Sequence, residues 1–391
     1  MTKRRLRVLA VILMIAVSGS LLTGMLSLIV SDRYAAQRDF IEYWAAGQQL
    51  HSGANPYDTD ALLKLEASVG LEGNHPRVTW SPPIIFSILW PLGLVRAKTG
   101  FILWTVVLLA CLSIALGILW KLMGRPTGRL HLLGYLFAPV LCCLNAGQLG
   151  IFLLLSVVLF LYFHQSRPFL AGAALLPCAF KPHLFLPFAI VLLLWIVHKK
   201  AYRLLFGFAF ILLAGCATTL YLDIHAWDQY LRMMRTERSL QMFAPTLSAL
   251  FRSFVDRNAV WPQFIPEVAG CTWALWYFLT NRSHWKWMNH GMLLLLVSAL
   301  CTPYAFFTDE SMLLPAILIG LYRAVDSRRY LAPLAFISAL ALVESLKFPL
   351  YSLFYLWTVP AWLIWFLYST RSKNAAAEEI DRNYTEVEES L

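Results

Sequence analysis

Long apolar runs separated by short basic turns constrain this chain more than any other feature. The first run extends from Leu6 to Val30 behind a basic N-terminus, and further runs recur to about residue 369. A helix needs about 20 apolar residues to cross the hydrocarbon core of a bilayer. Of the 391 residues, 59% are hydrophobic and only 14% are charged, whereas soluble domains contain about 25% charged residues. The pattern predicts an all-α polytopic membrane protein.

About 12 membrane spans are predicted. The first apolar run is longer than the stretch of about 7–15 residues in a signal peptide, so we expect a retained first helix. Several spans are short or interrupted by proline, and the count is given to within about two. They would form a single integral membrane domain, 1–372, followed by a polar tail, 373–391, that is predicted to be disordered. The expected spans are 8–30, 99–120, 130–144, 150–164, 168–180, 183–198, 203–222, 263–281, 288–303, 311–323, 330–346 and 350–369.

The positive charges predict the orientation of these spans. With the N-terminus in the cytoplasm, the turns on that side are basic, as in His198–Arg203, which agrees with the positive-inside rule. An even number of spans returns the C-terminus to the same side. The other side receives two long loops, 31–98 and 223–262, and function is concentrated in loops on a rigid scaffold. We therefore expect a multi-pass protein of the cell inner (plasma) membrane with cytoplasmic termini and an extracytoplasmic active site.

Charge and cysteine content argue against several other classes. The net charge is +10, but the cations lie mostly in short turns and no soluble basic domain is present, so nucleic acid is not expected as a partner. The seven cysteines fall in apolar segments without a CxxC pair, which favours buried small side chains over a metal cluster or disulfides. The histidines and acidic residues of the first loop have no spacing that resembles a metal site, so we expect no metal and no cofactor.

The stretch from Arg38 to Asp58 is the most polar part of the first loop, and it begins close to a predicted membrane boundary. Its first carboxylates are Asp39 and Glu42, and an ionisable residue at such a boundary is costly unless it has a function or a partner. Asp39 is a candidate helix N-cap, with Glu42 completing a capping box. It is also a candidate general base, and the two roles are compatible.

A short amphipathic helix is expected over Phe40–Leu50, lying in the plane of the membrane interface. One face of this helix carries residues at i, i+3, i+4 and i+7 spacing, namely Phe40, Tyr43, Trp44 and Gly47. Gly53 and Pro56 are expected to end it, since both residue types interrupt helices.

Several motifs in this chain, taken in order, resemble those of glycosyltransferase family 87. This family belongs to the GT-C superfamily and includes polyprenol-phosphate-mannose-dependent α-mannosyltransferases. The first motif is Asp39-Phe40, Tyr43-Trp44, Ala46-Gly47, Leu50, Gly53 and Asn55-Pro56-Tyr57-Asp58. The later ones are Ser81-Pro82-Pro83, Trp90-Pro91-Leu92, Gly147-Gln148, Lys181-Pro182 and the stretch from Thr302 to Asp309. The resemblance covers about residues 35–320.

The last of these motifs departs from the family pattern. Tyr304 stands where the family commonly has histidine, and Thr308 stands where it commonly has tyrosine. This weakens a histidine-based role for the motif and indicates a donor or acceptor different from that of the best-known members. Asp309 and Glu310 are retained.

The resemblance implies a GT-C fold in which extracytoplasmic loops carry short interfacial helices. It also implies transfer of a hexose, most commonly mannose, from a polyprenyl-phosphate sugar donor to a lipid or glycan acceptor. Asp39 then corresponds to the catalytic aspartate of the first loop, which takes the proton from the acceptor hydroxyl. A single inverting displacement needs one such base opposite the leaving phosphate.

Basic residues are candidates for binding the donor phosphate. Arg232, Arg235 and Arg238 recur every three residues, so a helix would place them along one broad face. Arginine makes forked hydrogen bonds to phosphate, although attraction to lipid head groups explains such a row equally directly. Lys181 is either an interfacial lysine that extends toward water or, as the family's lysine-proline pair implies, a contact of the donor phosphate.

Other polar and aromatic residues are candidates for substrate binding, and each has a structural alternative. A lone histidine is usually a structural residue, an aspartate after a turn is often a cap, and interfacial aromatics form belts. Gln148 either bonds a sugar hydroxyl or satisfies the backbone. The substrate-binding candidates are Glu42, Tyr43, Trp44, Asp58, Gln148, His183, Tyr304 and Asp309.

A lipid-linked saccharide transporter or a polysaccharide ligase is the alternative function. A transporter usually has paired broken helices and intramembrane charges in matching halves. Neither feature is evident in this sequence, where the polar residues gather in loops on one side. A membrane scaffold is disfavoured by the dense motifs of the first loop.

Overall fold

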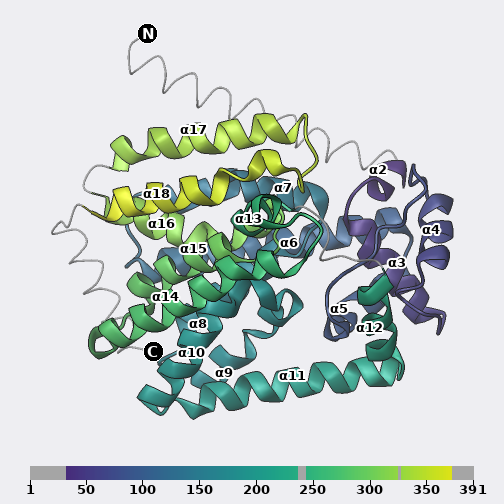
Figure 1. Ribbon diagram of the computed structural model, residues 1–391, viewed down its shortest axis with the longest axis horizontal. Coiled ribbons are helices and arrows are strands. Elements are labelled where there is room, and N and C mark those ends of the chain that lie inside the picture. Colours follow the sequence, from purple (N-terminus) through teal and green to yellow (C-terminus); the bar gives the residue numbers. More distant parts are fainter. Residues whose placement is uncertain (1–31, 237–243, 325–326, 372–391) are drawn as a thin grey trace, which may run out of the picture.

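The computed structural model describes residues 32–236, 244–324 and 327–371, and all regular elements in these residues are helices (Figure 1). The expected first span at 8–30, Arg238 and the tail at 373–391 lie outside the described residues. All seven cysteines are free thiols; Cys142 and Cys143 are buried, and the other five are partly buried.

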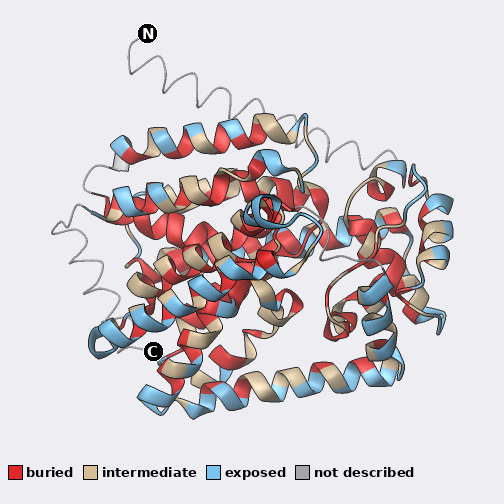
Figure 2. Ribbon diagram, in the orientation of Figure 1, coloured by how far each residue is buried: buried red, intermediate tan, exposed pale blue. Residues whose placement is uncertain are grey.

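Within the part of the chain that the structure describes, four stretches of helix are long and apolar enough to cross a membrane. They are α6 (Ala97–Leu122), η6 (Pro182–Phe185) with α10 (Leu186–Lys199), α11 (Tyr202–Leu222), and η12 (Leu353–Tyr355) with α18 (Thr358–Thr370). Their exposed apolar side chains support a membrane environment: on α11, Phe206, Phe210 and Leu213 are each more than 60% exposed (Figure 2). Such surface is compatible with lipid and not with water.

Shorter helices occupy most of the other expected spans, and the count of twelve therefore stays a prediction. Proline at the start of many of them shortens the regular helical stretches, because proline is favoured in the first turn and usually disfavoured in the interior. These elements are η4 (Leu130–Leu136), α7 (Ala138–Ala146), α8 (Gly150–Phe163), α9 (Pro168–Ala173), η5 (Leu176–Phe180), α14 (Ile265–Asn281), η9 (Arg282–His284), η10 (Trp287–Gly291), α15 (Met292–Cys301), η11 (Phe307–Leu313), α16 (Leu314–Arg323) and α17 (Ser327–Ser345).

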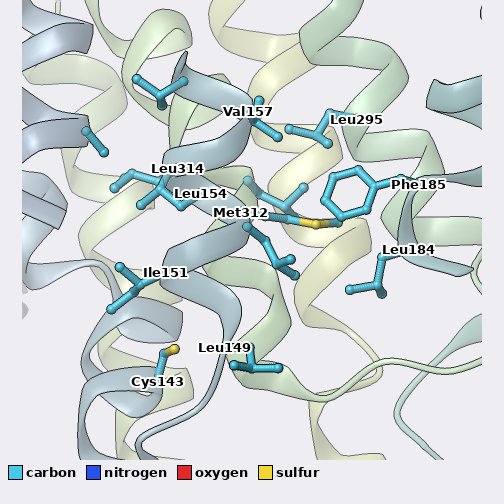
Figure 3. Close-up of a cluster of buried hydrophobic side chains, with 14 of the residues drawn as sticks. Cys143, Leu149, Ile151, Leu154, Val157, Leu184, Phe185, Leu295, Met312 and Leu314 are labelled. Atoms are coloured by element: carbon cyan, nitrogen blue, oxygen red, sulfur yellow. The ribbon is translucent and has the colours of Figure 1, made fainter. Parts of the chain in front are cut away.

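The core centres on α8, which is apolar on all sides and buried along most of its length. Figure 3 shows Ile151, Leu154 and Val157 of α8 among buried side chains of η6, α15, η11 and α16, including Leu184, Phe185, Leu295, Met312 and Leu314. This packing holds the residue two positions before α8, the residue before η6 and the first turn of η11 in one place. Those three positions are Gln148, Lys181 and Asp309.

The first-loop unit comprises the short helices between residues 32 and 94, at the right of Figure 1. It is tied to the membrane helices by a hydrogen bond of 2.8 Å from Thr219 Oγ1 of α11 to the carbonyl of Pro83. Its elements are α2 (Asp32–Ala36), α3 (Phe40–His51), α4 (Thr59–Ser68), η2 (Pro83–Ile85), α5 (Phe86–Leu89) and η3 (Trp90–Leu94). The second loop contributes α12 (Ala226–Thr236), α13 (Leu247–Val255) and η8 (Trp261–Phe264).

The helix α3 begins where the sequence predicted but is not an interfacial helix with one exposed face. Ile41, Ala45 and Ala46 are fully buried along with the aromatic face. Gly47 allows α5 and η3 to approach α3 closely, because a Cβ at Gly47 would lie only 2.4 Å from the carbonyl oxygen of Leu89. Protein therefore covers both faces of this helix.

Candidate active site

Asp39 lies between α2 and α3 and is held by two donors from distant parts of the chain. Its Oδ1 accepts a hydrogen bond of 2.7 Å from Arg77 Nη1, and its Oδ2 accepts one of 3.1 Å from Gln148 Nε2. Although it occupies the N-cap position of α3, its side chain caps no backbone N–H, so the expected capping box with Glu42 is wrong. About a third of the side chain (32%) is exposed, which leaves the carboxylate accessible to a substrate.

Gln148 orients this carboxylate. The Tyr43 hydroxyl donates a hydrogen bond of 2.8 Å to Gln148 Oε1, which turns the amide nitrogen toward Asp39. Tyr43 is 1% exposed and Gln148 2% exposed, so the orientation is fixed by packing as well. Gly147 permits the approach, because its φ of +73° suits glycine and a Cβ there would lie 2.7 Å from Phe40 Cβ.

Arg77 was not among the residues predicted from sequence. It lies in the irregular stretch between α4 and η2, where its backbone N–H donates a hydrogen bond of 2.9 Å to the buried Glu66 carboxylate. Its side chain is 32% exposed. No spacing rule relates it to Asp39, which lies 38 residues earlier, and only the fold brings the two together.

Glu42 brings a second carboxyl group to the same region. Burial raises the pKa of Glu42 to about 8, and the negative charge of Asp39 adds to the rise. The positive charges of Lys181 and Arg77 act in the opposite direction. Glu42 is therefore mostly protonated at neutral pH, and it adds little negative charge beside Asp39.

Lys181 and Asp309 form a buried ion pair with an Nζ–Oδ1 distance of 2.7 Å. Their side chains are 10% and 1% exposed, and Asp309 Oδ2 also accepts a hydrogen bond of 3.0 Å from the backbone N–H of Phe306. The pair adjoins the first-loop residues, since Lys181 acts electrostatically on Glu42 and Asp309 acts on Tyr43. The structure thus brings Asp39, Glu42, Tyr43, Gln148, Lys181 and Asp309 into one cluster.

Half-buried aromatic rings line the same cluster. The ring of Tyr304 lies 5.5 Å from those of Trp80 and His183, and 5.0 Å from that of Phe306. Burial, and then the negative charge of Asp309, raise the pKa of Tyr304 well above its ordinary value. His183 Nε2 has no hydrogen-bond partner among the described residues. These rings offer stacking faces, and His183 offers a polar atom for an incoming hydroxyl.

Three of the predicted residues have structural contacts outside the cluster. Trp44 Nε1 donates a hydrogen bond of 2.9 Å to the carbonyl of Val95. Asp58 caps α4 by accepting hydrogen bonds of 3.1 and 3.0 Å from the N–H groups of Asp60 and Ala61. This is the structural role that the sequence analysis gave as the alternative to substrate binding. The exposed Arg232 pairs with Asp228 within α12.

Arg235 is exposed on α12 as well, so the two described arginines of the predicted row face outward rather than contacting the cluster. Among the described residues, no group of three or more His, Cys, Asp and Glu side chains is arranged to hold a metal ion.

The arrangement combines an accessible carboxylate, two cationic side chains and a wall of aromatic rings. A carboxylate held by neutral and cationic donors can accept a proton from a hydroxyl group. Cations nearby can stabilise a leaving phosphate. These are the requirements of a group transfer from a phosphate to an alcohol.

The sequence model of glycosyltransferase family 87 matches residues 81–324. The matched range contains Gln148, Lys181, His183, Tyr304 and Asp309, and it begins after the first-loop motif. No curated protein and no solved structure matches the chain.

Proposed function

The chain belongs to glycosyltransferase family 87 and is a membrane glycosyltransferase, and on this basis we propose that it transfers a hexose from a polyprenyl-phosphate sugar. Mannose is the first candidate for the hexose, and the acceptor is a lipid or a glycan. The observation that carries the proposal is the contact of Asp39 with Gln148, which joins an accessible carboxylate to the part of the chain that matches the family.

Asp39 is the proposed general base. The acceptor hydroxyl oxygen attacks the anomeric carbon while its proton passes to Asp39, and the bond from that carbon to the phosphate oxygen breaks. The result is inversion at the anomeric carbon, as for any single displacement. Polyprenyl phosphate leaves already ionised, so the reaction needs no general acid.

Lys181 is the proposed contact of the donor phosphate within the site. Its ammonium group has three N–H donors, of which Asp309 accepts one, so the others are available to a phosphate oxygen. Arg232, Arg235 and Arg238 are proposed to meet the donor's phosphate or the lipid head groups from the second loop. The aromatic rings of Trp80 and Tyr304 are proposed to stack on the sugar.

The site is proposed to face the extracytoplasmic side of the cell inner membrane, with both termini in the cytoplasm and residues 1–372 forming one domain. This orientation follows from the basic turns on the opposite side. It places the active site where a polyprenyl-phosphate sugar with its head group on the extracytoplasmic side would meet a lipid or glycan acceptor.

Purified full-length protein tests the donor class. It would be incubated with radiolabelled polyprenyl-phosphate mannose, polyprenyl-phosphate glucose or the corresponding nucleotide sugars, together with lipid and glycan acceptors. We expect label to reach an acceptor only from a polyprenyl-phosphate donor. Transfer from a nucleotide sugar would contradict the proposal, as would movement of intact lipid-linked sugar across proteoliposomes without any transfer.

A further inference from the structure

Arg77 adjoins the cluster through Asp39, and the proposed function leaves its role open. It contacts the carboxylate that acts as the base, yet it comes from an irregular stretch outside the matched range. Only one hydrogen bond of its guanidinium, that to Asp39, occurs within the described part of the chain. A guanidinium has five N–H donors in a planar fork, so most of its capacity is unused.

The Lys181–Asp309 and Arg77–Asp39 ion pairs differ in how easily their two side chains can separate. Lys181 and Asp309 are 10% and 1% exposed, whereas Arg77 and Asp39 are each 32% exposed. Separating a buried pair leaves an uncompensated charge, while an exposed pair is readily exchanged. Arg77 is therefore the cation that can change partner.

The contact with Arg77 also hinders Asp39 from acting as a general base. Arg77 occupies Oδ1 of Asp39 at 2.7 Å and Gln148 occupies Oδ2, so an incoming acceptor hydroxyl has to compete with Arg77 for the carboxylate. Phosphate competes well for arginine, because the planar fork matches phosphate oxygens. Asp39 would keep its position after losing Arg77, since the bond from Gln148 is itself held by Tyr43.

We propose that Arg77 is a transferable counter-ion, which pairs with Asp39 in the free enzyme and with the donor phosphate in the complex. Binding of the polyprenyl-phosphate sugar then releases the base for the acceptor. During transfer the anomeric carbon forms its bond to the acceptor oxygen, and the acceptor proton goes to Asp39. The electron pair of the broken bond stays on the phosphate oxygen beside Arg77. This inference rests on the proposed function.

Binding of decaprenyl phosphate tests the exchange without requiring turnover. Affinity would be measured for the full-length protein in nanodiscs, using wild type, Arg77→Gln, Asp39→Asn and the double variant. We expect Arg77→Gln to weaken binding by about tenfold, the effect of one charge-assisted hydrogen bond. Asp39→Asn should tighten binding, because it frees Arg77 and removes a like charge. The loss caused by Arg77→Gln should be larger in the Asp39→Asn background.

Arg33→Gln is the matched control, because Arg33 forms an exposed ion pair with Glu72 in the same loop. We expect it to leave the affinity unchanged. Arg77→Lys retains the charge without the fork and should bind with intermediate affinity, which provides a second readout if Arg77→Gln folds poorly.

Two results would overturn the exchange while leaving the proposed function intact. One is an unchanged affinity in Arg77→Gln, and the other is an equal loss in both backgrounds, which would mean that Arg77 binds phosphate without leaving Asp39. Failure of wild type to bind decaprenyl phosphate would instead reject the donor class, and with it the proposed function.

Discussion

Gln148 donates a hydrogen bond of 3.1 Å to Asp39 across 109 residues of chain. This contact joins a residue just before α8, within the matched range, to a carboxylate that precedes that range. It fixes one oxygen of Asp39 while a third of the side chain stays exposed. Asp39 and Tyr43 of the first-loop motif are thus in contact with Gln148 of a later motif.

The Tyr43 hydroxyl should matter for turnover more than for substrate binding. Tyr43→Phe removes the donor that orients the Gln148 amide, and the buried Oε1 is left without its partner. We expect kcat to fall by about fivefold to tenfold, in line with about 1–1.5 kcal/mol for one hydrogen bond, with little change in KM. Steady-state kinetics would show this, and a change confined to KM would contradict the orienting role.

Breaking the Lys181–Asp309 pair should destabilise the protein strongly. Asp309→Asn leaves a buried ammonium without its counter-ion, at a cost of about 3–5 kcal/mol. Replacing both residues by methionine and leucine should restore most of the stability but not the transfer. Thermal unfolding in detergent would measure both effects. An Asp309→Asn variant as stable as wild type would show that the pair is not needed for folding.

The carboxyl group of Glu42 should make stability depend on pH. Its pKa is about 8 in the folded chain against 4.5 for an unperturbed glutamic acid, so the folded state binds the extra proton between these values. The resulting stabilisation is complete below pH 4.5 and is lost as the pH rises through about 8. Glu42→Gln should flatten this decline in a comparison of melting temperatures across that window. Parallel curves for the two proteins would contradict the assignment.

The contact between α3 and η3 should tolerate no added methyl group. A Cβ at Gly93 would lie 2.2 Å from a backbone oxygen of α3, so Gly93→Ala should cost about 3 kcal/mol or more. Gly117→Ala on α6 is the matched control, since nothing lies within 4 Å of its added Cβ. That variant should be neutral or slightly more stable, because alanine favours helix over glycine. Chemical denaturation would compare the two.

Apolar periodicity alone places many of the helices correctly. The expected spans at 99–120 and 203–222 are α6 (Ala97–Leu122) and α11 (Tyr202–Leu222), and the helix expected to begin at Phe40 does so. These elements follow from local composition, which a reader of the sequence can count. The bounds of helices that proline interrupts cannot be predicted in this way, because the same composition fits one long span or two short helices.

The partners of the site residues could not be predicted in the same way. Lys181 and Asp309 lie 128 residues apart, and no sequence pattern states that they pair. Asp39 matches an N-cap by residue type, yet its side chain finds stronger partners in Arg77 and Gln148 than in the backbone. In both places, tertiary contacts determine which partner the side chain has.

Transfer by Asp39→Asn, compared with wild type and with Asp60→Asn, tests the proposed mechanism most directly. Asp60 is an exposed carboxylate on α4 in the same loop and serves as the control. With a labelled polyprenyl-phosphate hexose and its acceptor, we expect Asp39→Asn to lose about 10²–10⁴-fold in rate, the range for a general base. Its melting temperature should stay close to that of wild type, and Asp60→Asn should retain full activity. Wild-type turnover by Asp39→Asn would contradict the role of Asp39 as the base.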